Sequence, residues 1–161
     1  AQVATVVPGP TWREATRYAP LISERQANKV AGAVSESVAQ GAQARCGGSF
    51  FDLGLDGFYY RPTVLTDVTD DMIAVREEIF GPVLTVQVFD EEEEGLALAD
   101  HPTYGLAAGV HTQDIGRALR ATRRISRRHA APQRGTGRRH PTGAFQGMWR
   151  RRLFRRGRSS A

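Results

Sequence analysis

The clearest periodic pattern of apolar positions lies between residues 23 and 41. The apolar stripe consists of three valines spaced four residues apart, Val30, Val34 and Val38. Ser23 followed by Gln26 is a capping-box pattern, in which each side chain would satisfy the other residue's free backbone N–H. Gly41 then suits the end of a helix, where glycine is common. The pattern predicts a helix over residues 23–41.

Downstream, β-branched and apolar runs alternate with helical patterns. The runs predict strands at residues 42–46, 59–66, 83–89 and 106–111. The helical patterns lie at 70–78, at 90–99, with a solvated acidic start at 91–94, and from residue 114 onward. The last helix should bury one face formed by Ile115, Ala118, Leu119, Thr122 and Ile125. Sixteen residues separate the buried strand at 83–89 from the strand at 106–111, enough for a crossover. We therefore predict a parallel βαβ unit and an α/β fold.

The net charge of +5 conceals a sharp division along the chain. Residues 1–114 carry all 17 acidic residues and seven basic ones, whereas residues 115–161 carry 15 arginines and no acid. After residue 126 neither the helical nor the strand period is present. Such a run could bind phosphates, and Trp149 and Phe154 could stack on bases. One hypothesis is therefore a nucleic-acid-binding module.

Composition excludes several other classes of protein. Apolar residues make up 40% of the chain, but no run approaches the roughly 20 residues that span a bilayer. We predict no signal peptide, no membrane span and a cytoplasmic location, in a chain that begins inside a longer protein. Cys46 is the single cysteine and cannot form an internal disulfide. His101 and His111 lack neighbours at ligand spacing, so we predict no metal site.

Two adjacent carboxylates precede an apolar turn at residues 76–84, which read REEIFGPVL. On a helical turn Glu77 and Glu78 would point about 100° apart, so they could not flank one reacting bond as a catalytic pair. A solvated surface pair is the ordinary alternative. A carboxylate fixed beside the rigid turn at residues 80–82 could instead accept hydrogen bonds from a polyol such as ribose.

Four segments resemble one family in the same order along the chain. They are APLISERQANKV at 19–30, GFYYRPTVLTDVTDDM at 57–72, VREEIFGPVLTVQVFD at 75–90 and PTYGLAAGVHTQDIGRALR at 102–120. Over residues 19–126 the chain resembles the C-terminal part of the NAD(P)-dependent aldehyde dehydrogenases. The resemblance implies that Glu78 binds the nicotinamide-ribose hydroxyls of the cofactor and that Phe80 packs beside the nicotinamide. Gly81 and Pro82 would position both, and Glu77 would be structural.

The resemblance also implies an activity, the oxidation of an aldehyde to a carboxylic acid with NAD or NADP, in a homo-oligomer. The family's nucleophilic cysteine and basic glutamate lie in GQ.C and ELGGK-like motifs, which this chain lacks. Cys46 is therefore expected to be a structural thiol, and we assign no catalytic residue. No G-x-G-x-x-G fingerprint for a pyrophosphate is present either. We expect the isolated chain to be inactive; a non-catalytic subunit of a full-length paralogue is a further possibility.

The predicted domain organisation has two parts. Residues 1–126 form part of an aldehyde dehydrogenase catalytic domain, and residues 127–161 form an arginine-rich tail that is not natively folded. In the tail the likeness is lost, recovers in HPTGAFQG at 140–147 and is lost again. Only one of the 22 basic residues is lysine. This pattern predicts that residues 127–139 and 148–161 are frameshift products, which reading the coding DNA in the other two frames tests.

Overall fold

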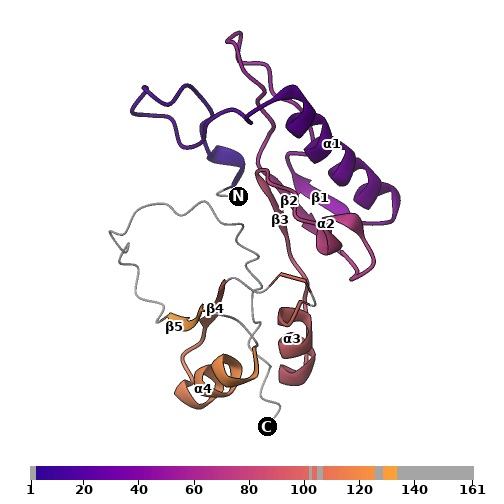
Figure 1. Cartoon of the computed structure of the whole chain (residues 1–161), viewed down its shortest axis with the longest axis vertical. Coiled ribbons are helices and arrows are strands. Elements are labelled where there is room, and N and C mark those ends of the chain that lie inside the picture. Colours follow the sequence, from indigo (N-terminus) through magenta and orange to yellow (C-terminus); the bar gives the residue numbers. More distant parts are fainter. Residues whose placement is uncertain (1–2, 102, 105–106, 126–128, 134–161) are drawn as a thin grey trace. The chain divides into compact units, whose positions relative to one another are not determined.

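The computed structural model describes residues 3–101, 103–104, 107–125 and 129–133. The chain divides into two compact units, residues 1–87 and residues 88–161, whose elements are labelled in Figure 1. Within the described ranges, no helix is long and apolar enough to cross a membrane.

The first long helix, α1 (Glu24–Ala39), forms where the valine pattern predicts it, after a short 3₁₀ turn, η1 (Val3–Thr5). Ser23 caps its N-terminus, because the Ser23 Oγ accepts a hydrogen bond from the Gln26 backbone N–H at 3.2 Å. Gly41 follows the helix with a φ of +111°, which glycine adopts without the cost of a Cβ. Val30 and Val34 are buried, but the third valine of the stripe is exposed. The predicted helix is confirmed.

Three strands form the sheet of the first unit, in the order β1-β2-β3. They are β1 (Gln43–Cys46), β2 (Thr63–Thr66) and β3 (Val83–Thr85). β1 is antiparallel to β2, and β3 is parallel to β2 with Leu84 opposite Val64. The helix α2 (Ile73–Arg76) lies in the connection between the two parallel strands. The unit therefore contains a short parallel β2-α2-β3 crossover.

Two of these elements are shorter than the sequence predicts. α2 has four residues, and β3 ends at Thr85 with its residues only partly buried. Beyond β3 the Gln87 Nε2 donates to the Asp70 carboxylate at 2.9 Å and to the Val68 carbonyl at 3.4 Å. These side-chain bonds tie the chain after β3 to the loop before α2, where further strand and helix were expected.

The core of the first unit joins α1, β2, α2 and the turn after α2. It includes Val30, Val34, Tyr60, Leu65, Val75 and Ile79. The buried Ser37 Oγ accepts a hydrogen bond from the Ala74 N–H at 3.2 Å, which links α1 to α2 directly. α1, which runs alongside the sheet in Figure 1, is thus fixed to the segment that leads into the turn.

The described residues of the second unit form two helices and two strands. They are α3 (Glu92–Ala99), β4 (Ala107–His111), α4 (Ile115–Arg124) and β5 (His129–Gln133). Asp114 caps α4 by accepting a hydrogen bond from the Arg117 N–H at 3.1 Å. The predicted apolar face of α4 is partly wrong, because Ile115 is 66% and Leu119 46% exposed. Ala118 and Ala121 in the helix and Ile125 at its C-cap are buried, so the prediction holds for Ala118 and Ile125.

Within each unit the strands have parallel partners that the sequence did not predict. We expected the strands at 83–89 and 106–111 to pair across the helix between them. In the part of the chain that the structure describes, β3 pairs with β2, and β4 pairs in parallel with β5. Each parallel partner is reached through a helix of its own, α2 or α4. The α/β fold with parallel strands is confirmed. The predicted pair would join strands of two different units and stays a prediction.

β5 lies inside the segment that we predicted to lack native structure. Residues 129–133 align with β4, from Ala107 opposite His129 to His111 opposite Gln133. Ladder hydrogen bonds use backbone groups and need no apolar period. Pro132 is tolerated because both strands of a two-stranded sheet are edges. The rest of the predicted tail lies outside the described residues, and the division at residue 126 stays a prediction.

Candidate functional site

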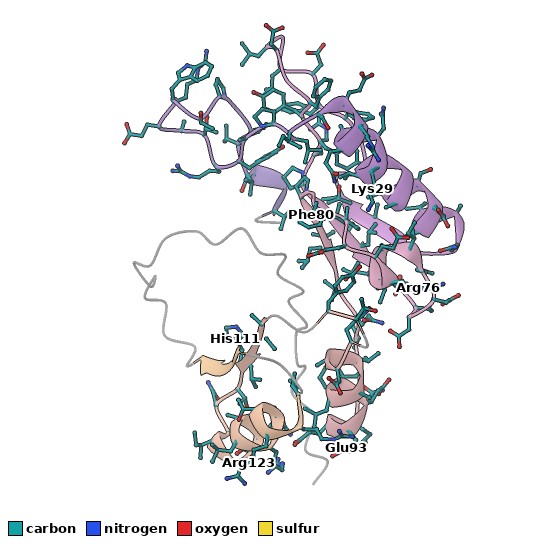
Figure 2. The ribbon with its side chains drawn as sticks, in the orientation of Figure 1. Lys29, Arg76, Phe80, Glu93, His111 and Arg123 are labelled. Carbon is teal, nitrogen blue, oxygen red and sulfur yellow. The ribbon has the colours of Figure 1, made fainter. Side chains whose placement is uncertain are left out.

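The turn after α2 alternates a buried with an exposed side chain. Ile79 is 4% exposed and belongs to the core, whereas the next residue, Phe80, is 60% exposed. Phe80 has a φ of +49°, in the left-handed region that residues with a Cβ seldom occupy. Figure 2 shows Phe80 beside α1, which carries Lys29. The structure thus holds a large aromatic ring toward solvent on an unusual backbone conformation.

Gly81 fixes the position of the turn against α1. A Cβ at Gly81 would lie 2.5 Å from the Val30 Cγ2, which is closer than real Cβ contacts. The Pro82 carbonyl then accepts a hydrogen bond from the Thr63 N–H at 2.8 Å, so the turn passes directly into pairing with β2. Contact with the helix on one side and with the sheet on the other leaves this segment little freedom.

Two side chains of α1 bind the backbone of the turn. The Gln26 Nε2 donates to the Ile79 carbonyl at 2.7 Å and to the Phe80 carbonyl at 3.1 Å. The Lys29 Nζ donates to the Glu78 carbonyl at 3.4 Å. The serine half of the predicted capping box is confirmed, but the Gln26 side chain reaches across to the turn. Sequence reasoning missed this use of Gln26 and Lys29; only their spacing of three residues hinted that they share a helix face.

The two glutamates differ in environment. Glu77 is exposed, and its Oε2 lies 3.7 Å from the Lys29 Nζ, while Glu78 is partly buried. The helix that we assumed beneath them ends at Arg76, and Glu77 has extended dihedrals. In extended backbone successive side chains point to opposite sides, so the argument against a catalytic pair holds for a different reason.

Other candidate residues have structural partners. The Cys46 Sγ donates to the Pro62 carbonyl at 3.7 Å. The His101 Nδ1 accepts hydrogen bonds from the backbone N–H groups of Thr103 and Tyr104, both at 3.1 Å. Among the described residues, no three histidine, cysteine or carboxylate side chains gather as metal ligands would.

The acidic start of α3 is more than a solvated surface, which corrects our expectation for Glu92. Its carboxylate accepts hydrogen bonds from Arg120 Nε at 2.7 Å, from Arg120 Nη2 at 2.9 Å and from Arg117 Nε at 3.0 Å. The bonds from Arg120, joined by those from Arg117, lower the pKa of Glu92 from 4.5 to about 2 against the opposing effect of burial. Glu92 therefore joins α3 to α4.

Comparison with known proteins gives a consistent result. The model of the aldehyde dehydrogenase family matches residues 1–149. Betaine aldehyde dehydrogenase of Brucella anthropi is 46% identical over 114 residues, which are 70% of this chain and 23% of that protein. Human 4-trimethylaminobutyraldehyde dehydrogenase is 50% identical over 111 residues, covering 66% of this chain and 22% of that protein.

The comparison with solved structures points to the same family as the sequence comparisons. Betaine aldehyde dehydrogenase of Staphylococcus aureus, in complex with NAD⁺, superimposes with a TM-score of 0.77 at 34% identity, over 81% of this chain and 26% of that one. The chain thus spans about a quarter of the length of these relatives. The motifs, the fold and the comparisons agree that the chain belongs to the aldehyde dehydrogenase family.

Proposed function

We propose that this chain supplies the nicotinamide-side contacts of the cofactor site in an NAD(P)-dependent aldehyde dehydrogenase. The Glu78 carboxylate accepts hydrogen bonds from the nicotinamide-ribose hydroxyls, and the Phe80 ring packs beside the nicotinamide. The observation that carries the proposal is the exposed Phe80 ring, held on a left-handed backbone between a buried residue and a glycine packed on α1.

The chemistry of these two side chains suits that ligand. An ionised carboxylate only accepts hydrogen bonds, and ribose hydroxyls can donate them. The face of a phenylalanine ring is electron-rich and attracts a flat cationic ring such as oxidised nicotinamide. Glu78 precedes Phe80 by two residues in a segment fixed on both sides. One short segment can therefore contact a ribose and the base attached to it.

The activity that this site would serve is the oxidation of an aldehyde to a carboxylic acid. When bound, the dinucleotide would supply the acceptor for the hydride that leaves the aldehyde carbon. The residues of this chain would orient the nicotinamide end and cover one side of it. The NAD⁺ complex of the S. aureus relative favours NAD. The catalytic cysteine and glutamate motifs are missing from this sequence, so we expect no dehydrogenase activity from the 161 residues alone.

A chimera would test the role of Glu78. In human 4-trimethylaminobutyraldehyde dehydrogenase, the matched 111-residue segment would be replaced by that of this chain. In Glu78→Gln an NH₂ donor replaces one oxygen of the charged acceptor, which should raise the Kd for NAD roughly ten- to hundredfold. The control Glu77→Gln removes the neighbouring exposed carboxylate and should change Kd less than about twofold. Equal effects of the two substitutions in calorimetric titration would contradict the proposal.

The second hypothesis, that the arginine-rich part of the chain binds nucleic acid, has less support than the cofactor site. Fifteen arginines without an acid in residues 115–161 could bind DNA, but Arg117 and Arg120 are already paired with Glu92. DNA affinity that falls steeply with salt, and that is abolished by deleting residues 127–161, would favour a nucleic-acid-binding module.

A further inference from the structure

A single glutamine amide binds two successive carbonyl groups of the turn that carries Phe80. The Gln26 Nε2 lies 2.7 Å from the Ile79 oxygen and 3.1 Å from the Phe80 oxygen. We propose that Gln26 is a positioning residue, which sets the direction of the Phe80 ring by holding these two carbonyls. The consequence for the cofactor rests on the proposed function of Phe80.

The chemistry of the amide matches this task. A glutamine NH₂ group has two N–H donors, and each of the two carbonyls is an acceptor. A glutamate of the same length is acceptor-only when ionised and would repel both oxygens. A leucine fills similar space and donates to neither. The role therefore depends on the NH₂ group and not only on the volume of the side chain.

The turn requires such a restraint because its backbone is unusual. Phe80 has a φ of +49°, which a residue with a Cβ adopts only where the surroundings impose it. Ile79 is anchored in the core before it, and Gly81 packs against Val30 after it. These contacts fix the two ends of the turn, but neither involves the Phe80 carbonyl. Gln26 donates a hydrogen bond to that carbonyl.

The contacts come from one face of one helix. Gln26, Lys29 and Val30 lie at positions i, i+3 and i+4 of α1, and each touches the segment at residues 78–81. The Lys29 bond is the longest of the hydrogen bonds, at 3.4 Å, and comes from an exposed ammonium. Gln26 is therefore the member whose loss should release the backbone of Phe80.

The first test uses the full 161-residue chain without any cofactor. Phe80 would be replaced by 4-fluorophenylalanine, and the fluorine resonance compared between the native sequence, Gln26→Leu, Gln26→Glu and the control Asn28→Leu. Asn28 is an exposed amide on the same helix. We expect one narrow resonance in the native chain and in Asn28→Leu. Both Gln26 variants should show a shifted, broadened or second resonance.

Urea unfolding of each variant separates local release from global unfolding. A changed resonance at an unchanged unfolding midpoint supports the proposal, and Gln26→Glu, which keeps the side-chain length, guards against a packing effect in Gln26→Leu. An unchanged fluorine resonance in both Gln26 variants overturns it. So does a change that appears only together with loss of the folded baseline.

The second test asks whether the released turn matters for the cofactor. In the chimera described above, Gln26→Leu should raise the Kd for NAD about tenfold without a matching loss of thermal stability. If Glu78→Gln leaves NAD binding unchanged, the proposed function fails, while the fluorine measurement still decides whether Gln26 positions Phe80. If Glu78→Gln weakens binding and Gln26→Leu does not, the positioning role in cofactor binding is overturned.

Discussion

Neighbouring residues of the turn after α2 have opposite environments, and the sequence anticipates only part of this. The resemblance assigns different roles to Glu78 and Glu77, and these roles stay predictions. The Glu77 side chain is exposed, and its carboxylate lies 3.7 Å from the Lys29 ammonium. The apolar pattern alone does not predict the exposure of Phe80, because a phenylalanine in an apolar run is usually buried. It depends on the left-handed backbone that α1 and Gly81 impose.

Gly81 provides a stability test at this scale. A methyl group at Gly81 would meet the Val30 Cγ2 at 2.5 Å, whereas one at Gly32 on α1 would meet nothing within 4 Å. Gly81→Ala should lower the free energy of unfolding by about 1–3 kcal/mol through overpacking. Gly32→Ala should raise it by up to about 1 kcal/mol, because alanine favours a helix interior.

Urea denaturation of the full chain measures both changes. Adding Val30→Ala should reduce the cost of Gly81→Ala, since it removes the methyl groups that clash. Equal effects at the two glycines, or additivity of Gly81→Ala with Val30→Ala, would contradict the close contact between the turn and α1.

At the scale of elements, α3 and α4 are joined through Glu92 and its two arginines. The pKa of Glu92 is about 2 in the folded chain and near 4.5 without its partners, so the unfolded chain binds the proton more readily. Its stabilising contribution is therefore complete above about pH 4.5 and is lost as the pH falls toward 2. Glu92→Gln should lower the free energy of unfolding by on the order of 1 kcal/mol at pH 7. Its free energy of unfolding should also fall less at acid pH than that of the native chain.

Glu93 is the matched control for that prediction. It is exposed, stands next to Glu92 on α3 and is labelled in Figure 2. Glu93→Gln should keep the native dependence of unfolding on pH, followed by circular dichroism between pH 7 and pH 2.5. A Glu92→Gln chain that is as acid-sensitive as the native one would show that the arginine pairs do not stabilise the unit.

Elements whose ends are marked by residues of their own segment were predictable from the sequence. The strands and helices against which they pack or pair were not. Ser23 and Gly41 mark the ends of α1 within the chain segment itself, so α1 could be placed from the sequence. The pairing of β3 with β2 depends on contacts between distant segments, and the face that α4 buries depends on β4. β5 could not be predicted because its sequence has no apolar period. It is recognised as a strand through its backbone pairing with β4.

At the scale of the whole molecule, the chain is a family member that spans about a quarter of its relatives. The family could be recognised because four motifs occur in order, and the match to residues 1–149 confirms it. The match runs across residues 127–139, which we predicted to be a frameshift product, and across residues 140–147, where the likeness recovers. The coding DNA remains the test of that prediction.

The central claim is that Glu78 of this chain contacts the nicotinamide ribose and not the ADP half of the cofactor. Its most direct test measures the binding of ADP-ribose and ADP to the chimera and to its Glu78→Gln variant. ADP-ribose carries the second ribose, and ADP does not. We predict that Glu78→Gln weakens ADP-ribose binding roughly ten- to hundredfold and leaves the Kd for ADP unchanged. Unchanged ADP-ribose binding, or an equal loss for both ligands, would contradict the account.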